Sequence, residues 1–268
     1  VLSINEALSL DETGRIDSGF FSKSQIKVRA LSANWECLDQ CCETVACGPF
    51  GSTILDTNYV EDGVPMIRPF NLRDLRSDAG DIVRLSEEFV AEQNLKLFKK
   101  GDLMFARVGD VGCSPLVQAR ATISPNIIAA SLKPGTLNPF FVSVFFNTPY
   151  GALQMQGAMK VVAQPTISTE LIRKLKVPKQ SKTFQQSIER TFVESESLLL
   201  RARASHAQAE QTLLQALGLK NWQPPEPLTY SRRASEVLAA ERFDSEYFAP
   251  RVEQLLFKLS ADGLTIHD

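Results

Sequence analysis

Residues 183–217 constrain the fold most, because neither Gly nor Pro interrupts them. Apolar and small side chains recur there at alternating steps of three and four, the heptad pattern of a helix that buries one stripe. The pattern predicts a helix of about 35 residues, well beyond the usual 10–14, which Gly218 is expected to end. We call the stripe the seam; it comprises Ile188, Phe192, Ser195, Leu199, Ala202, His206, Ala209, Leu213 and Ala216.

The seam has two interpretations. Either the helix packs on its own domain, or it is one strand of a coiled coil. The length of the helix favours the coiled coil, and small residues at every seventh position would let a partner helix approach closely. The seam residues expected to meet that partner are Ile188, Phe192, Leu199, Ala202, Ala209 and Leu213.

An internal repeat gives the organisation of the chain. Arg-Ile-Asp-Ser-Gly-Phe-Phe at 15–21 recurs as Arg-Phe-Asp-Ser-Glu-Tyr-Phe at 242–248. Leu-Ser-Ala at 31–33 also recurs at 259–261, one residue out of step. A period of roughly 230 residues is too long for a solenoid. It indicates a protein of two large halves, of which this chain holds one and the opening of the next.

The rest of the chain reads as mixed elements. Between residue 34 and about 180, turn signals bound short apolar segments. The strands expected there are Pro65–Phe70, Leu103–Arg107, Ala121–Ile123 and Ile127–Leu132. Asn138 and Pro139 predict a helix start, Thr169–Leu175 a short helical turn, and Pro250 a C-terminal helix after a proline-rich linker. The expected class is α+β: a mixed domain at 1–180, a long helix at 181–218 and a further helical segment at 219–268.

Composition excludes some classes of protein. No apolar run reaches the roughly 18 residues of a membrane span, and no basic-then-apolar signal pattern opens the chain; we therefore expect a cytoplasmic protein without membrane contact. The formal net charge is −2. Because proteins that bind only phosphates are usually basic, DNA binding requires positive charge concentrated on one face, or a basic partner.

The five cysteines predict reduced thiols rather than a disulfide framework, because their number is odd. Cys37, Cys41, Cys42 and Cys47 cluster in sequence. A structural zinc site needs a second pair of ligands further along, and the sequence offers none. Buried thiols on a strand are the favoured interpretation, and no metal site is expected. Four glycines are expected to serve turns that need a positive φ: Gly48, Gly51, Gly109 and Gly112.

Enzyme motifs are missing. The sequence has no phosphate-binding loop ending in Lys-Ser/Thr, no dinucleotide fingerprint and no Gly-x-Ser-x-Gly elbow. Asn147-Thr148-Pro149-Tyr150 is a weak match to the Asn-Pro-Pro-Tyr loop of adenine methyltransferases, but no cofactor-binding glycine motif precedes it. We therefore expect a protein that is not an enzyme and holds no cofactor.

Several segments resemble one family in order and spacing over nearly the whole chain. They are Gly-Pro-Phe-Gly-Ser at 48–52, Gly-Val-Pro-Met-Ile-Arg at 63–68, Lys-Gly-Asp-Leu-Met-Phe at 100–105, Gln-Pro-Thr-Ile-Ser at 164–168, and Val-Pro at 177–178 before the long helix. This series resembles the target-recognition domain of type I restriction-modification specificity subunits. Thr166 and Lys179 depart from the usual pattern, which loosens the subfamily assignment. Such subunits are usually two tandem halves, which agrees with the repeat.

The resemblance implies a sequence-specific DNA-recognition subunit that reads one half of an interrupted site in double-stranded DNA. Its implied partners are DNA methyltransferase subunits and, in a restricting system, a restriction subunit; S-adenosylmethionine and ATP are expected only on them. Self-association through the coiled coil is a further expectation. The alternative is a coiled-coil protein-interaction adaptor without DNA readout, which the acidic balance favours.

A DNA face needs Arg or Lys for phosphates and Arg, Asn or Gln for base edges. The candidates are polar residues at predicted strand ends or in loops, where the alternative role is a solvated surface residue or a local ion pair. They are Arg68, Asn71, Arg73, Arg107, Lys160 and Gln164.

Overall fold

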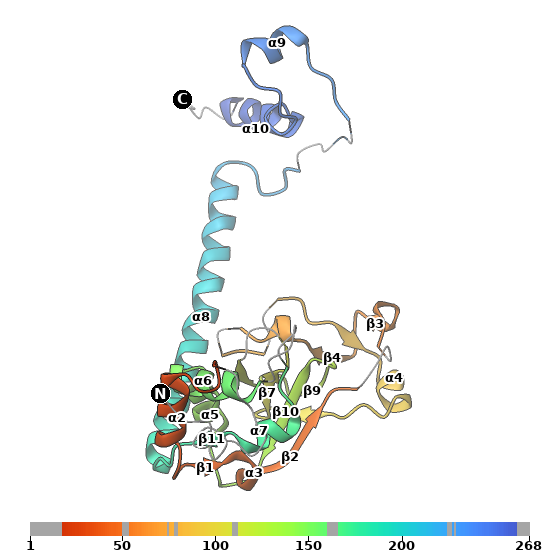
Figure 1. The fold of residues 1–268 in the computed structure, drawn as a ribbon. Coiled ribbons are helices and arrows are strands. Elements are labelled where there is room, and N and C mark those ends of the chain that lie inside the picture. Colours follow the sequence, from red (N-terminus) through yellow and green to blue (C-terminus); the bar gives the residue numbers. More distant parts are fainter. Residues whose placement is uncertain are drawn as a thin grey trace. The chain divides into compact units, whose positions relative to one another are not determined.

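The computed structural model describes residues 18–49, 54–73, 75–77, 80–108, 112–159, 166–223, 227 and 229–261. The chain divides into two compact units, Val1–Val193 and Glu194–Asp268, and each is described by itself. In the described residues, the first unit holds the strands and most of the short helices, and the second is helical (Figure 1). The class is α+β, as the sequence predicted.

A four-stranded antiparallel sheet in the first unit has the order β2-β10-β7-β8. Ile128 and Ala130 of β10 join a core under the helices, whereas Ile127 and Ala129 join a core against a second sheet. The central strands β10 and β7 are thus buried on both faces, which explains why apolar and small residues follow one another along them without regular alternation. Its strands are β2 (Cys42–Cys47), β10 (Ile127–Leu132), β7 (Leu103–Ala106) and β8 (Cys113–Pro115). The bounds predicted for β10 are confirmed.

The second sheet has the order β3-β5-β4-β9-β6. Its central pair, β4 and β9, is parallel, with Ile67 opposite Ile123. β4 ends at Ile67, short of the predicted Phe70, because Pro69 starts the 3-10 turn η2 (Pro69–Asn71). The helix α4 (Glu87–Glu92) packs against β4 and β5 through Val90, which shares a buried cluster with Val64 and Leu85. The strands are β3 (Tyr59–Val60), β5 (Arg84–Leu85), β4 (Val64–Ile67), β9 (Arg120–Ile123) and β6 (Phe98–Lys99), and the 3-10 turn η1 (Asp56–Asn58) precedes β3.

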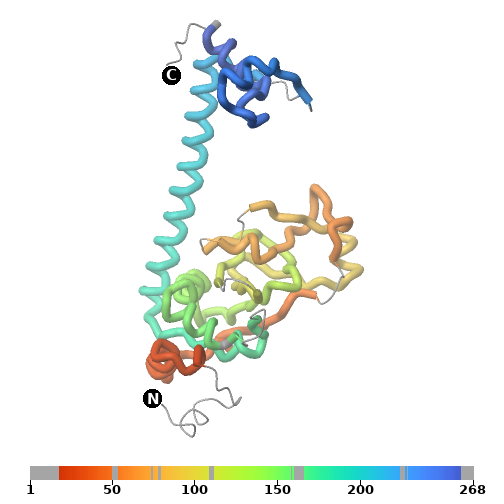
Figure 2. Tube along the Cα trace, turned by 45° about the horizontal axis from the view of Figure 1, so that its top comes forward, coloured from red at the N-terminus to blue at the C-terminus, as the bar shows by residue number. Residues whose placement is uncertain are grey.

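A layer of helices covers the other face of the four-stranded sheet. Asn138 caps the first of them as predicted, since its side chain accepts hydrogen bonds from the N–H groups of Phe140 and Phe141. Figures 1 and 2 both place α2, α5 and α6 at one end of the unit and β3 with α4 at the other. The helices are α2 (Lys23–Leu31), α3 (Leu38–Cys41), α5 (Pro139–Phe146), α6 (Pro149–Ala158) and α7 (Thr169–Lys174); β1 (Glu36–Cys37) pairs with β11 (Lys176–Val177) beside them.

The long helix α8 (Lys182–Ala216) has 35 residues, and its predicted existence is confirmed. Its first turn is hydrogen-bonded to the start of α5: the buried side chain of Gln185 accepts a hydrogen bond from the N–H of Asn138, the cap of α5, at 2.8 Å. Gly218, at φ +65°, ends it, and the Leu219 N–H bonds back to the Leu214 carbonyl at 2.7 Å. This is the left-handed cap expected of a glycine. In the described residues, no helix is long and apolar enough to cross a membrane.

The second unit continues with α9 (Ala234–Ala239) and α10 (Pro250–Ala261). Its repeat motif has the local geometry of the first copy. The rings of Phe20 and Phe21 meet edge to face at 5.0 Å, and those of Tyr247 and Phe248 at 4.9 Å. In both copies a helix begins two residues later. Positions 15–17 of the first copy lie outside the described residues.

Candidate nucleic-acid interface

Four strand ends of the first unit meet at one turn. Because β4 and β9 are parallel, their carboxyl ends lie at the same edge. The turn at 124–126 then connects β9 to β10, and β2 and β7 run antiparallel to β10, so that they end beside its start. We call this place the turn edge: the turn Ser124–Asn126 together with Gly48, Arg68 and Arg107.

Backbone hydrogen bonds tie the turn to three neighbouring segments. Its own closing bond runs from the Ile127 N–H to the Ser124 carbonyl at 3.0 Å. The Ser124 N–H bonds to the Ile67 carbonyl at 2.9 Å, and the Asn126 carbonyl accepts from the Arg107 N–H at 2.9 Å. On the third side the Gly48 N–H bonds to the Ile127 carbonyl at 3.1 Å. The backbone of the turn is therefore firmly positioned.

Glycine is required at position 48 because the backbone of the turn lies too close to leave room for a Cβ atom, and not because the position needs a positive φ. Its φ is not positive, contrary to the expectation from sequence, and neither is that of Gly112. A Cβ on Gly48 would lie 2.1 Å from the Ser124 carbonyl oxygen. Any side chain at this position would therefore push β2 away from the turn. Gly51 and Gly109 lie outside the described residues.

Arg107 lies at the turn edge, one residue beyond β7. Its Nη1 is 3.5 Å from the Pro125 carbonyl oxygen and 3.8 Å from the Cys47 sulfur. The side chain is partly buried, so its charge is held beside the turn.

Arg68 and Asn71 belong to a loop that leaves the carboxyl end of β4. Asn71 is fully buried: its Oδ1 accepts from the Arg68 N–H at 2.9 Å, and its Nδ2 donates to the Asp81 carbonyl at 3.1 Å. Arg68 Nη2 donates to the same carbonyl at 2.9 Å. Asn71 thus closes the loop, and Arg68 stands next to Ser124 across the parallel pair.

Arg73 lies in the same loop with its side chain exposed. Its guanidinium carbon is 4.7 Å from the ring centroid of Phe70, a cation–π arrangement. Ser77 anchors the loop, because its Oγ accepts a hydrogen bond from the Val117 N–H at 3.0 Å.

Lys160 and Gln164 lie outside the described residues. The chain that follows them returns to the turn edge, where Thr166 forms a bridge with Val108 and the Ile167 N–H bonds to the Arg107 carbonyl at 3.1 Å.

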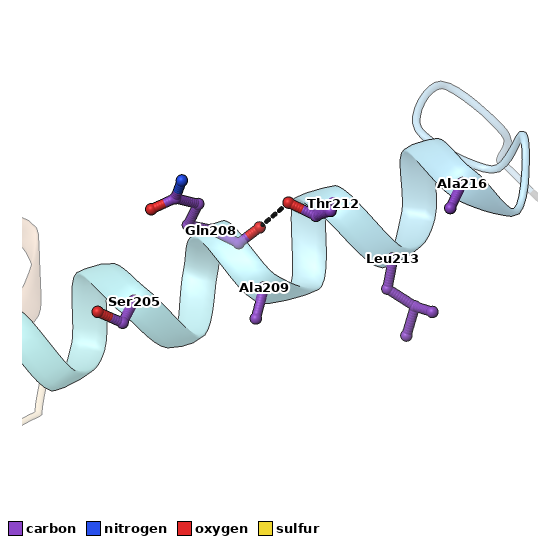
Figure 3. Close-up of a pocket in the computed structure, with 6 residues that line it drawn as sticks. All are labelled: Ser205, Gln208, Ala209, Thr212, Leu213 and Ala216. Atoms are coloured by element: carbon purple, nitrogen blue, oxygen red, sulfur yellow. Dashed lines mark hydrogen bonds between the residues drawn. The ribbon is translucent and has the colours of Figure 1, made fainter.

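The structure divides the predicted seam into two parts. Phe192 packs against Phe140 of α5 with the two rings tilted and their centroids 4.9 Å apart, and Ile188 packs against the core of the first unit. From Leu199 onward the seam is exposed: Leu213, for example, is 59% exposed. Figure 3 shows that Ala209, Leu213 and Ala216 point to one side of α8, while Gln208 points to the other. Ala202 and Ala209 are exposed as well.

The cysteines differ in burial. Cys41, Cys42 and Cys113 are buried, and burial raises the pKa of the Cys42 thiol to about 12. Cys37 and Cys47 are partly exposed and donate to the Arg173 and Pro125 carbonyls. Within the described part of the chain no group of three or more His, Cys, Asp or Glu side chains is placed to hold a metal ion.

Sequence reasoning did not single out Ser124, Pro125 and Asn126. Ser124 is buried, and its Oγ has no hydrogen-bond partner among the described residues. Arg68 Nε, on the neighbouring strand end, is likewise buried without a described partner. The only sequence signal for the turn was a proline between two apolar strands, which does not reveal the neighbours of the turn.

No protein-family model and no curated protein matches the sequence. The fold is similar to solved structures from restriction-modification systems at low identity. The HsdS subunit from Thermoanaerobacter tengcongensis is 14% identical over 81% of this chain, with a TM-score of 0.42. The S subunit of a type I system from M. genitalium is 14% identical over 69%, with a TM-score of 0.40. The type IIG restriction endonuclease BpuSI is 10% identical over 97%, with a TM-score of 0.48. The chain covers 54%, 43% and 36% of these proteins respectively.

Proposed function

We propose that this chain is a sequence-specific DNA-recognition subunit of a restriction-modification complex, that it reads one half of an interrupted site, and that it does no chemistry itself. One observation carries the proposal: Arg68 and Arg107, which follow different strands, stand on two sides of a turn that backbone hydrogen bonds hold. Rigid cationic groups at a strand edge suit DNA, since arginine contacts both phosphates and the guanine edge in the major groove.

The candidate residues receive different roles in this proposal. Arg107 and Arg68 face the DNA from the turn edge, and the exposed Arg73 contacts a phosphate. Asn71 positions Arg68, because both ends of its buried amide are hydrogen-bonded within the loop. Lys160 and Gln164 remain candidates from the sequence alone.

The net charge of −2 fits a chain whose positive charge is local and whose partners add the rest. Those partners are DNA methyltransferase subunits, which supply S-adenosylmethionine, and in a restricting system an ATP-dependent restriction subunit. The part of the seam from Leu199 onward is proposed to bind a partner helix, from such a subunit or from a second copy of this chain.

Binding to DNA tests the function. Fluorescence anisotropy with a random-sequence duplex, and then selection from a random library, are done with and without a methyltransferase subunit. We expect weak binding alone and selection of one half-site sequence in the complex. The chain alone should transfer no methyl group from labelled S-adenosylmethionine to DNA. A complex that binds no DNA would support the adaptor function instead, for which the exposed seam of α8 is the surface.

A further inference from the structure

We propose that Asn126, at the tip of the turn edge, is a base-reading residue that recognises an adenine in the major groove. The inference rests on the proposed function and names a residue outside the set that the sequence singled out. Its chemical basis is the amide: an Asn side chain can accept from adenine N6 and donate to N7 at the same time, a pairing that no other base offers in the major groove.

The fold itself does not use the Asn126 side chain. Asn126 is exposed, and within the described residues its amide makes no hydrogen bond; only its backbone carbonyl does, accepting from Arg107. Asparagine is often selected in turns because it tolerates a positive φ. Asn126 does not have one, so the turn does not need Asn on that ground.

The backbone below Asn126 is held on several sides. Pro125 fixes its own φ at the preceding position of the turn, and its carbonyl accepts from the Cys47 thiol at 3.4 Å. The Ser124 carbonyl lies so close to Gly48 that no Cβ fits between them. A recognition group must be held within about 0.5 Å of its binding geometry, and this turn meets that requirement better than a free loop.

The charges around Asn126 fit the same ligand. Arg107 holds its guanidinium beside the Pro125 carbonyl, and Arg68 follows Ile67, which pairs with Ile123 just before the turn. The Arg107 cation beside the turn, and Arg68 on the neighbouring strand end with its guanidinium at the Asp81 carbonyl, would hold phosphates while the Asn126 amide meets a base. Phosphate contacts position a protein on the duplex, and base contacts specify the sequence.

The experiment selects binding sites from a random duplex library with the assembled methyltransferase complex. Asn126→Ala is compared with wild type and with Gln156→Ala, which removes an exposed amide from α6 instead. We expect Asn126→Ala to lose preference at a single base pair, by about 5- to 150-fold, with every other position of the half-site unchanged. Gln156→Ala should select the wild-type sequence.

Asn126→Asp makes the test sharper. A carboxylate only accepts hydrogen bonds, and in the major groove it suits the N4 amino group of cytosine. The preferred base at the affected position should therefore change from adenine to cytosine. The thermal midpoints of both variants should equal that of wild type, because the amide has no role in the fold.

The outcomes separate the two proposals. If Asn126→Ala selects the wild-type site, or loses affinity equally for all sequences, the inference is wrong and the proposed function stands. If the preference lost is for a base other than adenine, the assignment of the base is wrong. If the wild-type complex selects no sequence at all, the proposed function fails, and this inference fails with it.

Discussion

The turn edge and the exposed seam of α8 are both candidate binding sites, but they differ in how they are built. At the turn edge four strand ends converge, and hydrogen bonds and a close glycine contact fix the backbone. The seam from Leu199 to Ala216 is one face of a single helix, with large apolar side chains exposed. The turn edge is thus positioned by contacts within the chain, whereas we propose that another helix buries the exposed seam.

This difference predicts where mutations act. Substitutions at the turn edge should change folding or DNA readout in the chain itself. Substitutions in the exposed seam should leave folding unchanged and alter association. Variants in the two regions, beginning with the most destabilising, test this division.

Gly48→Val should have the largest effect. Its side chain would overlap the Ser124 carbonyl, which lies 2.1 Å from an ideal Cβ, so the strand and the turn must separate. We expect a loss of about 3 kcal/mol in the free energy of unfolding, measured by urea denaturation. Gly112→Ala is the control, because within the described residues its Cβ would meet nothing nearer than Asn147 Oδ1, at 3.6 Å. Equal stability of the Gly48 variant and wild type would contradict the close packing.

Phe192→Ala separates the covered part of the seam from the exposed part. The Phe192 ring packs against Phe140, and truncation should cost about 2 kcal/mol of unfolding free energy, less than for a fully buried ring. Val193→Ala removes the next side chain, which is 54% exposed, and should cost under about 0.5 kcal/mol. Equal costs in urea denaturation would mean that α8 does not pack on α5.

Arg107→Ala tests the chemistry of the turn edge. If Arg107 reads a guanine, the loss should be about 1–3 kcal/mol on the selected site and small on random DNA. An equal loss on both sequences assigns it to a phosphate instead. Lys133→Ala is the control, because β10 places Lys133 roughly 20 Å from the turn. Arg68→Ala is measured alongside. Unchanged affinity of a variant for both DNAs would remove its arginine from the interface.

Sequence patterns predicted individual helices and strands better than they predicted which of these elements lie side by side. The bounds of β10, the Asn138 cap and the long helix followed from local patterns. The parallel pairing of β4 with β9 is a long-range choice that no local pattern encodes. For that reason the turn edge could not be assembled from the sequence. The sequence alone, for instance, does not distinguish Asn71 from a surface residue, because its burial depends on the Asp81 carbonyl, to which its amide donates a hydrogen bond in the fold.

Leu213→Ser should leave folding almost unchanged, because Leu213 is already 59% exposed. We expect under about 0.5 kcal/mol in urea denaturation. The dissociation constant for the partner helix should rise by about tenfold or more as apolar contact is lost. Sedimentation measures self-association, and titration measures binding to a methyltransferase subunit. Gln211→Ser, two residues before Leu213 and therefore on the opposite side of α8, removes an exposed side chain and should change neither. If Leu213→Ser leaves both associations intact, the seam is not the interface.

Inserting one heptad after Ala202 should have the smallest effect on stability and readout, because it keeps the seam in phase and leaves the turn edge untouched. At 1.5 Å per residue it lengthens α8 by about 10 Å, or roughly three base pairs of duplex. If α8 separates two recognition domains, as in two copies paired through their seams, the gap between half-sites should widen by that amount. Each half-site should keep its sequence, since the residues that read it are unchanged. Methylation mapping with the assembled complex measures both quantities. A two-residue insertion at the same position is the control: it rotates the seam beyond Ala202 by about 200°, to the opposite face of the helix, and should abolish pairing. A heptad variant that methylates sites with the original gap would show that α8 does not set the spacing.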